Sequence, residues 1–523
     1  MSDLFDQYIN GLSQTRGLQS IQGIRRGIEK ESLRVSPDGH LAQTPHPRGL
    51  GSALTHPAIT TDYSEALLEL ITPAFTRIEE TLGYLKNTHI FTYQNIPDEL
   101  LWVNSMPCIM GEEHTIPIAQ YGSSNIGKMK SIYRKGLGHR YGRLMQTISG
   151  IHYNFSFPEE FWLHYQDVLK NRQPLENFTS QQYFHLIRNF QRFSPLLIYL
   201  FGASPAVCAS FLSGRSHTLQ QHTSPGTLYQ PFATSLRMSD LGYQNDTQSG
   251  LNISYDSVQD YAATLRAAMG TPYAPYEKLN AGIGQTPQQL SSHILQIENE
   301  YYGQIRPKRN AKSGERPTTA LMQRGVEYIE MRCIDLNPFL DVGIDAEQMR
   351  FLDSFALYCL LHPSPPFDAQ ELKDIKANNQ QVVLEGRNPQ ANFLLNGKQS
   401  SITSWAKGIW PELEGIAELL DQAHDNGELY RSALKAQHQK LENLELTPSS
   451  RILRILEEEN INFFDFAIDR AAQSAKAFRA KKLKPGDQAY FEQLAKTSLD
   501  QQDLLEQQNE PPFETYLHNY LNT

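Results

Sequence analysis

Gly27-Ile-Glu-Lys-Glu-Ser-Leu-Arg-Val35 has the length of a β-strand and nearly alternates polar and apolar residues. Residues i and i+2 of a strand lie on the same face, so we expect Glu29 and Glu31 to project together. Neighbouring carboxylates repel each other, and a protein tolerates this most easily where cations lie between them. The alternative is a solvent-facing edge with ordinary charges, which composition alone favours because charged residues are mostly exposed.

A second strand is predicted over Ser149-Gly-Ile-His-Tyr-Asn-Phe-Ser-Phe157. Its apolar residues share one face, which must pack on a core, while His152, Asn154 and Ser156 share the other. This polar face could meet bulk solvent or line a cavity. A single histidine is more often structural than a ligand, so His152 alone does not decide between the two.

A third strand is predicted over Gly325-Val-Glu-Tyr-Ile-Glu-Met-Arg-Cys-Ile334, where Glu330 and Arg332 share a face. An isolated salt bridge would explain the pair. Alternatively, Glu330 binds a metal ion and Arg332 steadies a transferring phosphoryl group, since Mg²⁺ and arginine together neutralise the charge on its oxygens. A local basic run lies nearby in this acidic chain and suits a polyphosphate, although a solvated loop is the default: Arg306, Lys308, Arg309 and Lys312.

Glu69 has two equally weighted interpretations. If its segment is a strand, Glu69 lies between Leu67 and Ile71 on one face, where a carboxylate is costly to desolvate unless a cation meets it. If the segment is helical, Glu65 and Glu69 lie one turn apart on an exposed face. Short apolar runs are ambiguous in this way, and the sequence leaves the choice open.

These strands belong to a long region of short strands and Gly/Pro/Ser/Asn loops, from about residue 24 to 340, with helices expected at 179–192 and 256–268. A helix is expected at 3–22. The prolines of His362-Pro-Ser-Pro-Pro-Phe367 predict a boundary, beyond which the chain is mostly helical. We therefore predict a catalytic core over 1–365 and a helical region over 366–523 packed on it. The last thirty residues are expected to be peripheral.

The composition excludes several classes of protein. The chain has 523 residues, 40% hydrophobic content and a formal net charge of −10, which disfavours a nucleic-acid partner. The four cysteines are widely spaced without a C-x-x-C pair, so we expect buried, reduced thiols. The N-terminus lacks the pattern of a signal peptide. Residues 195–212 are the most apolar run, and Gly202, Ser204 and Pro205 interrupt it, which favours a buried strand–turn–helix. A cytoplasmic protein with no membrane partner is expected.

The candidate positions share one kind of chemistry. They are carboxylates or imidazole on predicted strands, accompanied by arginines and by no cysteine: Glu29, Glu31, Glu69, His152 and Glu330. Such a set suits a hard cation, Mg²⁺ or Mn²⁺, and not structural zinc.

Several long segments closely resemble the proteobacterial glutamate–cysteine ligases. The matching stretches are Gly23–Val35, Gly51–His56, Ala119–Gly122, Gln146–Phe155, Ser235–Tyr243, Leu295–Glu300, Ile305–Arg309 and Val326–Glu330. The likeness is dense from about residue 20 to 360 and thinner to the C-terminus. Because the motifs are long, ordered and correctly spaced, the resemblance is specific.

The resemblance implies an α+β, glutamine-synthetase-like fold, in which an antiparallel sheet forms a funnel-shaped active site with helices outside. It also implies a reaction. ATP phosphorylates the γ-carboxylate of L-glutamate, and the amine of L-cysteine attacks the acyl phosphate, which is the first step of glutathione synthesis. The expected cofactor is Mg²⁺, with Mn²⁺ possible, and ATP is a co-substrate. A monomer is expected, and no pattern indicates feedback inhibition or a thiol switch.

Carried over by position, the resemblance assigns roles to individual residues. It implies metal ligands at Glu29, Glu31, Asp62, Glu69, His152 and Glu330. It implies that Arg332 and Arg134 stabilise the phosphoryl group. It implies that the amino-acid substrates are held by Tyr133, Arg237, Tyr243 and Tyr302, with Arg237 pairing a substrate carboxylate.

Two other functions remain open at this point. A ligase with the same chemistry could accept a different amine, and only the acceptor pocket near Tyr133, Tyr243 and Tyr302 would differ. An inactive binding protein could keep the fold. The full set of carboxylates argues against the second alternative, because a binding module does not need so many like charges together.

Overall fold

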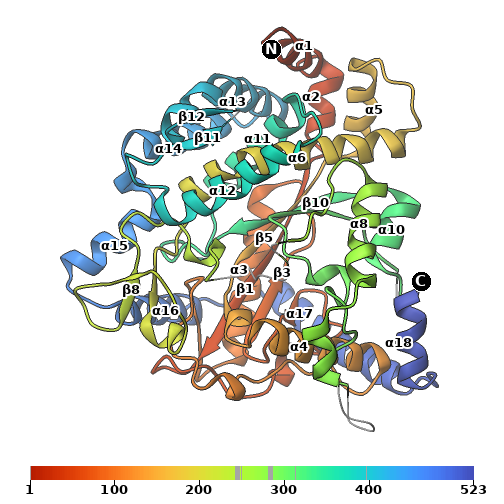
Figure 1. Ribbon diagram of the computed structural model, residues 1–523, viewed down its shortest axis with the longest axis vertical. Helices are drawn as coiled ribbons and strands as arrows, with labels where there is room; N and C mark the ends of the chain where they lie inside the picture. The colour runs from red at the N-terminus through yellow and green to blue at the C-terminus, as the bar shows by residue number, and fades with distance from the viewer. Residues whose placement is uncertain are drawn as a thin grey trace.

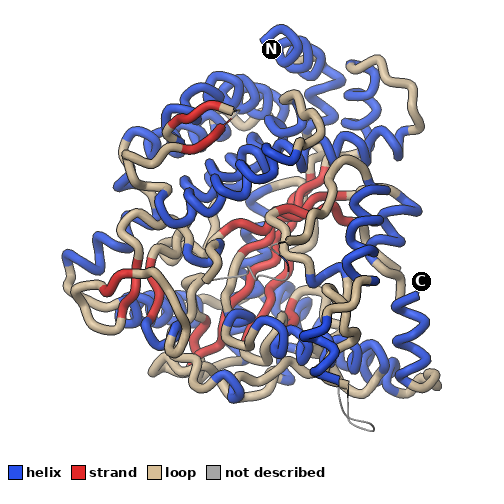
Figure 2. The backbone as a smooth tube through the Cα atoms, viewed as in Figure 1, coloured by secondary structure: helices blue, strands red, loops and turns tan. Residues whose placement is uncertain are grey.

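A computed structural model of the chain describes residues 2–241, 248, 250–280, 287–312, 314–395 and 397–522. Its centre is an antiparallel sheet in the order β2–β3–β1–β5–β10–β9, with β4 paired to β1 off this path (Figures 1 and 2). The strands are β1 (Arg25–Val35), β2 (Ile59–Thr61), β3 (Leu67–Ile71), β4 (Leu100–Leu101), β5 (Ile151–Ser156), β9 (Ile305–Lys308) and β10 (Tyr328–Ile334).

The register of this sheet confirms the predicted strands. β1 pairs with β5 on one side, where Glu29 is opposite His152, and with β3 on the other, where Glu31 is opposite Glu69. Glu69 therefore lies on a strand and not on a helix. β10 pairs with β5, and Glu330 is opposite Asn154.

Helices surround the sheet (Figure 1). α6 (Leu175–Phe201) packs on β9 and β10, while α3 (Ile78–Asn95) packs on β1 and β3. α11 (Ala346–Leu361) packs against α6 and also against α13 (Ile402–His424) and α14 (Leu429–Glu442). The remaining α-helices among the described residues are α1 (Ser2–Leu12), α2 (Thr15–Ile21), α4 (Asn125–Tyr141), α5 (Glu159–Val168), α8 (Val258–Gly270), α9 (Ala274–Glu277), α10 (Pro317–Arg324), α12 (Ala369–Glu385), α15 (Pro448–Glu458), α16 (Phe463–Arg479), α17 (Pro485–Glu506) and α18 (Phe513–Asn522).

The expected α+β class, an antiparallel sheet with helices outside it, is confirmed. The region after residue 365 is mostly helical, with one small hairpin of β11 (Phe393–Leu395) and β12 (Lys398–Ser400). Its helices α13 and α14 pack directly on α11 of the first region. The division into two domains at residue 365 stays a prediction.

Two local predictions were wrong. The helix expected at 3–22 is two helices, because Gln14 is extended (φ −67°, ψ 154°) and interrupts it. The run 195–212 begins as the end of α6, with Pro195 inside the helix, and only then forms β6 (Ala206–Cys208), which pairs with β8 (Thr227–Tyr229), itself paired with β7 (Gln220–Gln221). A short apolar run does not reveal whether it continues a preceding helix. Among the described residues, no helix is both long and apolar enough to span a membrane.

The expectation of four unpaired thiols was also wrong. Cys108 and Cys208 form a disulfide, with their Cα atoms 5.0 Å apart and a sequence separation of 100. The fold brings the segment after β4 against β6, where Ser210 Oγ also donates a 3.2 Å hydrogen bond to the Cys108 carbonyl. Cys333 and Cys359 are buried free thiols, as expected.

A buried ion pair joins the sheet to the helices behind it. The Arg26 side chain on β1 donates from Nε to Asp353 Oδ2 of α11 at 2.8 Å, and the two side chains are only 1% and 0% exposed. The hydroxyls of Tyr153 on β5 and Tyr430 on α14 also donate to Asp353, at 2.8 and 3.1 Å. One carboxylate thus connects two strands of the sheet with two helices.

Asp353→Asn is expected to destabilise the protein by about 3–5 kcal/mol, because it leaves the buried Arg26 guanidinium without its counter-charge. The midpoint of urea unfolding measures this change. The matched control is Asp167→Asn, which breaks an exposed ion pair with Arg16 (3.4 Å, 56% and 66% exposed) and should barely change the midpoint. Equal midpoints for Asp353→Asn and Asp167→Asn would contradict the prediction.

Candidate active site

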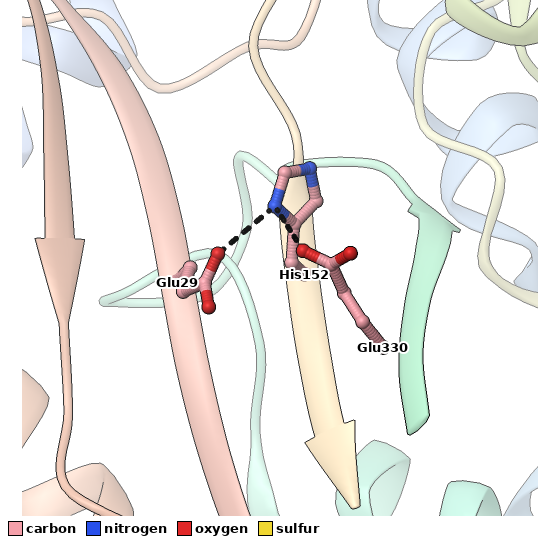
Figure 3. A group of neighbouring side chains, drawn as sticks. All are labelled: Glu29, His152 and Glu330. Atoms are coloured by element: carbon pink, nitrogen blue, oxygen red, sulfur yellow. Dashed lines mark hydrogen bonds and ion pairs between the residues drawn. The ribbon is translucent and has the colours of Figure 1, made fainter. Parts of the chain in front are cut away.

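Four adjacent strands contribute polar side chains to one face of the sheet. The cross-strand register places Glu29 beside His152 and Glu31 beside Glu69, and it brings Glu330 of β10 to the other side of β5. Figure 3 shows His152 between the carboxylates of Glu29 and Glu330. Period-two side-chain alternation explains why all five point the same way, since each lies on the same face of its strand.

The His152 ring is the centre of this cluster. Its Nδ1 lies 3.3 Å from Glu29 Oε2 and 3.5 Å from Glu330 Oε1, while Nε2 lies 3.8 Å from Glu31 Oε1. Three potential ligand atoms lie within 4.8 Å of one another, one each from Glu29, His152 and Glu330. Oxygen and imidazole ligands at this spacing can hold a divalent cation.

The carboxylates of the cluster have strongly perturbed acidities. Burial, followed by repulsion from Glu29 and Asp62, raises the pKa of Glu69 well above its ordinary value. Burial also raises the pKa of Glu31. Burial acts on Glu330 in the same direction, but the charges of Lys308 and Arg332 overcome it and hold its pKa well below its ordinary value. Negative charge is therefore crowded on the side of β3 and compensated on the side of β10.

Positive charge gathers around Glu330. Arg332 Nη1 donates to Glu330 Oε1 at 3.1 Å, and Lys308 Nζ of β9 lies 3.5 Å from Glu330 Oε2. Lys308 belongs to the basic run noted in the sequence, whose Arg306, Lys308 and Arg309 line a cavity of about 220 Å³ beside β9. Lys312 of the same run is exposed and outside that lining.

Asp62 and Arg134 meet at the β3 side of the cluster. Asp62 follows β2, and its main-chain carbonyl accepts a hydrogen bond from Arg134 Nε of α4. The Arg134 guanidinium also stacks 4.6 Å above the ring of Tyr121. These contacts fix an arginine next to a predicted metal ligand.

Three of the four predicted amino-acid ligands lie among the described residues. Tyr302 donates from its hydroxyl to Gln146 Oε1 at 3.1 Å, and Arg237 Nη2 donates to the Arg332 carbonyl at 2.9 Å. Tyr133 is partly buried on α4, where it packs against a small apolar cluster that includes Met129 and Ile132 and that α18 also covers. Tyr243, the remaining prediction, lies outside the described residues.

Sequence reasoning missed several contacts of the cluster. Asn154 Nδ2 donates to Glu29 Oε1 at 2.8 Å, and the Gly150 amide donates to Glu31 Oε2 at 2.6 Å. The sequence placed Asn154 on the polar strand face with His152 but assigned it no role in the cluster. Gly150 offers only a backbone group, which no side-chain pattern reveals.

Comparisons with known proteins agree with this geometry. The family model described as Glutamate-cysteine ligase matches residues 9–382. Over 99% of both chains, the sequence is 51% identical to the glutamate–cysteine ligase of Alcanivorax borkumensis. It is 47% identical to that of Pseudomonas aeruginosa, over 99% of this chain and 98% of the relative.

Solved structures give the same result. The crystal structure of the glutamate–cysteine ligase of Francisella tularensis in complex with AMP superposes with a TM-score of 0.89 at 35% identity, covering 96% of this chain and 98% of that one. A bifunctional glutathione synthetase from Pasteurella multocida superposes with a TM-score of 0.69 at 25% identity, covering 92% of this chain and 57% of that one. The chain belongs to the glutamate–cysteine ligase family.

Proposed function

We propose that the face built from β1, β3, β5 and β10 is the active site of an ATP-dependent ligase, and that its carboxylates and imidazole hold Mg²⁺ or Mn²⁺. As a member of the glutamate–cysteine ligase family, the protein joins the γ-carboxylate of L-glutamate to the amine of L-cysteine. ATP first phosphorylates the γ-carboxylate, and the cysteine amine then displaces phosphate, giving γ-glutamylcysteine, ADP and phosphate. This is the first step of glutathione biosynthesis.

The donor set fits hard divalent cations. We assign as ligands Glu29, Glu31, Asp62, Glu69, His152 and Glu330. The Oε2 atom of Glu330 is buried and accepts no hydrogen bond, and Glu69 is crowded by like charges. Both observations support a cation at the cluster, which would give this oxygen a closer partner than Lys308 Nζ at 3.5 Å and relieve the repulsion. When bound, the metal supplies charge neutralisation for the phosphoryl oxygens.

The cavity beside β9 is our candidate for the ATP site. Basic residues line it, with Lys308 contacting Glu330, and Tyr261 and Tyr328 also line it. This arrangement suits a nucleotide whose base packs on apolar walls and whose phosphates point toward the cluster. The relative from Francisella tularensis was solved with AMP, which supports nucleotide binding in this family.

The arginines and tyrosines have separate proposed roles. Arg332 is 18% exposed beside Glu330, so its guanidinium can reach a transferring phosphoryl group, and Arg134 lies at the opposite, Asp62 side. Tyr302 lines a second cavity of about 250 Å³ with Gln248 and Tyr301, which we assign to an amino-acid substrate. Tyr133, Arg237 and Tyr243 complete the proposed amino-acid site. The use of ATP supports a cytoplasmic location.

The observation that carries the proposal is the convergence of Glu29, His152 and Glu330 beside Arg332 and Lys308. The test is ADP release by the purified protein with Mg²⁺, ATP and L-glutamate, with and without L-cysteine. We expect cysteine-dependent release and a dipeptide product. ADP release with another amine but not with cysteine would show that the acceptor is a different amine. No ADP release under any condition would refute the proposal.

Metal binding is expected to release protons, because the raised pKa of Glu69 keeps its carboxyl group protonated to higher pH until a cation replaces the proton. The apparent affinity for Mg²⁺ should therefore rise with pH through the raised pKa of Glu69 and level off above it. Calorimetric titrations of Mg²⁺ in two buffers of different ionisation enthalpy measure the released protons. Binding heats that are identical in the two buffers would contradict this prediction.

A further inference from the structure

Asp335 is a buried carboxylate directly after β10, three residues beyond Arg332. Its side chain is 0% exposed. Oδ2 accepts hydrogen bonds from the Ala203 amide at 2.8 Å and from Ser204 Oγ at 2.6 Å, and Oδ1 accepts one from Ser235 Oγ at 2.9 Å. Three donors thus fix the orientation of the carboxylate.

The fixed carboxylate faces Arg237. Asp335 Oδ1 lies 3.7 Å from Arg237 Nη1, and both side chains are buried. On its other side, Arg237 Nη2 donates to the Arg332 carbonyl of β10 at 2.9 Å. The guanidinium is therefore held between an acidic side chain and the backbone of the strand that carries Glu330 and Arg332.

The space for this guanidinium exists because residue 150 is glycine. A Cβ atom at Gly150 would lie 2.0 Å from Arg237 Nη2 and 2.4 Å from its Cζ, closer than non-bonded atoms can approach. Gly150 immediately precedes β5, whose His152 is in the carboxylate cluster. Arg237 is thus enclosed by the start of β5, β10 and Asp335, next to the sheet face that carries the carboxylate cluster.

We propose that Asp335 is a positioning residue for amino-acid binding, acting through Arg237. This rests on the proposed function, in which Arg237 pairs the α-carboxylate of one amino-acid substrate. A guanidinium binds a carboxylate most strongly when the arginine is already oriented, because its side chain then loses no conformational freedom on binding. Because the Asp335 side chain is 0% exposed, it acts on the orientation of Arg237 and not on the substrate directly.

The test measures the KM of the full-length Asp335→Asn variant for each substrate, with Mg²⁺ and ATP. Two analogues lacking the α-carboxylate serve as probes: 4-aminobutyrate in place of L-glutamate and 2-aminoethanethiol in place of L-cysteine. We expect the KM for one amino acid to rise about tenfold or more, the size of a lost charge-assisted hydrogen bond, with kcat changed less. The KM for the corresponding analogue should stay unchanged, which identifies the amino acid bound by Arg237.

Asp167→Asn is the matched control. It makes the same Asp→Asn change in an exposed ion pair with Arg16, so it should move neither KM. In the Arg237→Ala background, Asp335→Asn should add no further increase in KM. Unchanged KM values for both amino acids, or an additive effect in that background, would overturn the proposal.

Ser235→Ala keeps the test decisive if Asp335→Asn does not fold. Ser235 Oγ donates to Oδ1, the oxygen that faces Arg237, so its removal should raise the KM for the same amino acid by a smaller factor. A KM equal to that of the wild type would reject the positioning role. A wild-type protein without ligase activity would instead refute the proposed function, so the two failures are distinguishable.

Discussion

Replacing Glu29 by glutamine is expected to lower turnover by about a thousandfold or more and to remove the stabilisation that Mg²⁺ gives the wild type. Glu29 contacts His152 and lies among like charges, including Glu69, whose pKa its charge helps to raise. The substitution by glutamine removes one carboxylate ligand from the metal-bound cluster. Loss of electrostatic stabilisation at a reacting phosphoryl group has effects of this order.

Two measurements separate these effects for Glu29→Gln. Steady-state ADP release gives turnover, and thermal melting with and without Mg²⁺ gives the stabilisation by metal, which for the wild type is about 2.7 kcal/mol at one hundred times Kd. The variant should lose this stabilisation. Glu327→Gln is the matched control, because Glu327 is an exposed carboxylate just outside β10 and should tolerate the change. Near-normal turnover in Glu29→Gln would show that the metal assignment is wrong.

The parts of the site that the sequence predicted are those that depend on local periodicity. Side-chain alternation alone placed Glu29 with Glu31, and Glu330 with Arg332, and the structure agrees. The choice for Glu69 could not be made locally, since its segment becomes a strand by pairing with β1. The resemblance to a family then connected strands whose order in the sheet no periodicity encodes.

The features that escaped prediction are contacts between distant segments. The Cys108–Cys208 bridge depends on a chain path of 100 residues. Asp335 meets Ala203, Ser204 and Ser235 across a comparable distance in sequence. Such contacts join segments that only the folded chain brings together, such as the turn between α6 and β6 and the residue after β10, and no motif signals them. Residues that orient the site residues without lining the site are therefore harder to predict from sequence than residues that line it.

Arg332→Ala is expected to lower kcat by about 10³–10⁵-fold, the range found for arginines that stabilise a transferring phosphoryl group. The KM for ATP should change much less, because the contact strengthens only as charge develops on the phosphoryl oxygens. Arg332 is oriented for this by Glu330 at 3.1 Å. A thousandfold loss corresponds to about 4 kcal/mol of transition-state stabilisation.

Arg309→Ala provides the contrast that makes the result for Arg332 interpretable. Arg309 lines the proposed nucleotide cavity and donates from Nε to the Gly325 carbonyl at 2.6 Å, away from the carboxylate cluster. Its loss should raise the KM for ATP and leave kcat nearly unchanged, because binding there is the same in the ground state and the transition state. If Arg332→Ala changed only the KM for ATP, the two arginines would share one role, and the phosphoryl contact would have to be assigned to Arg134 or Lys308.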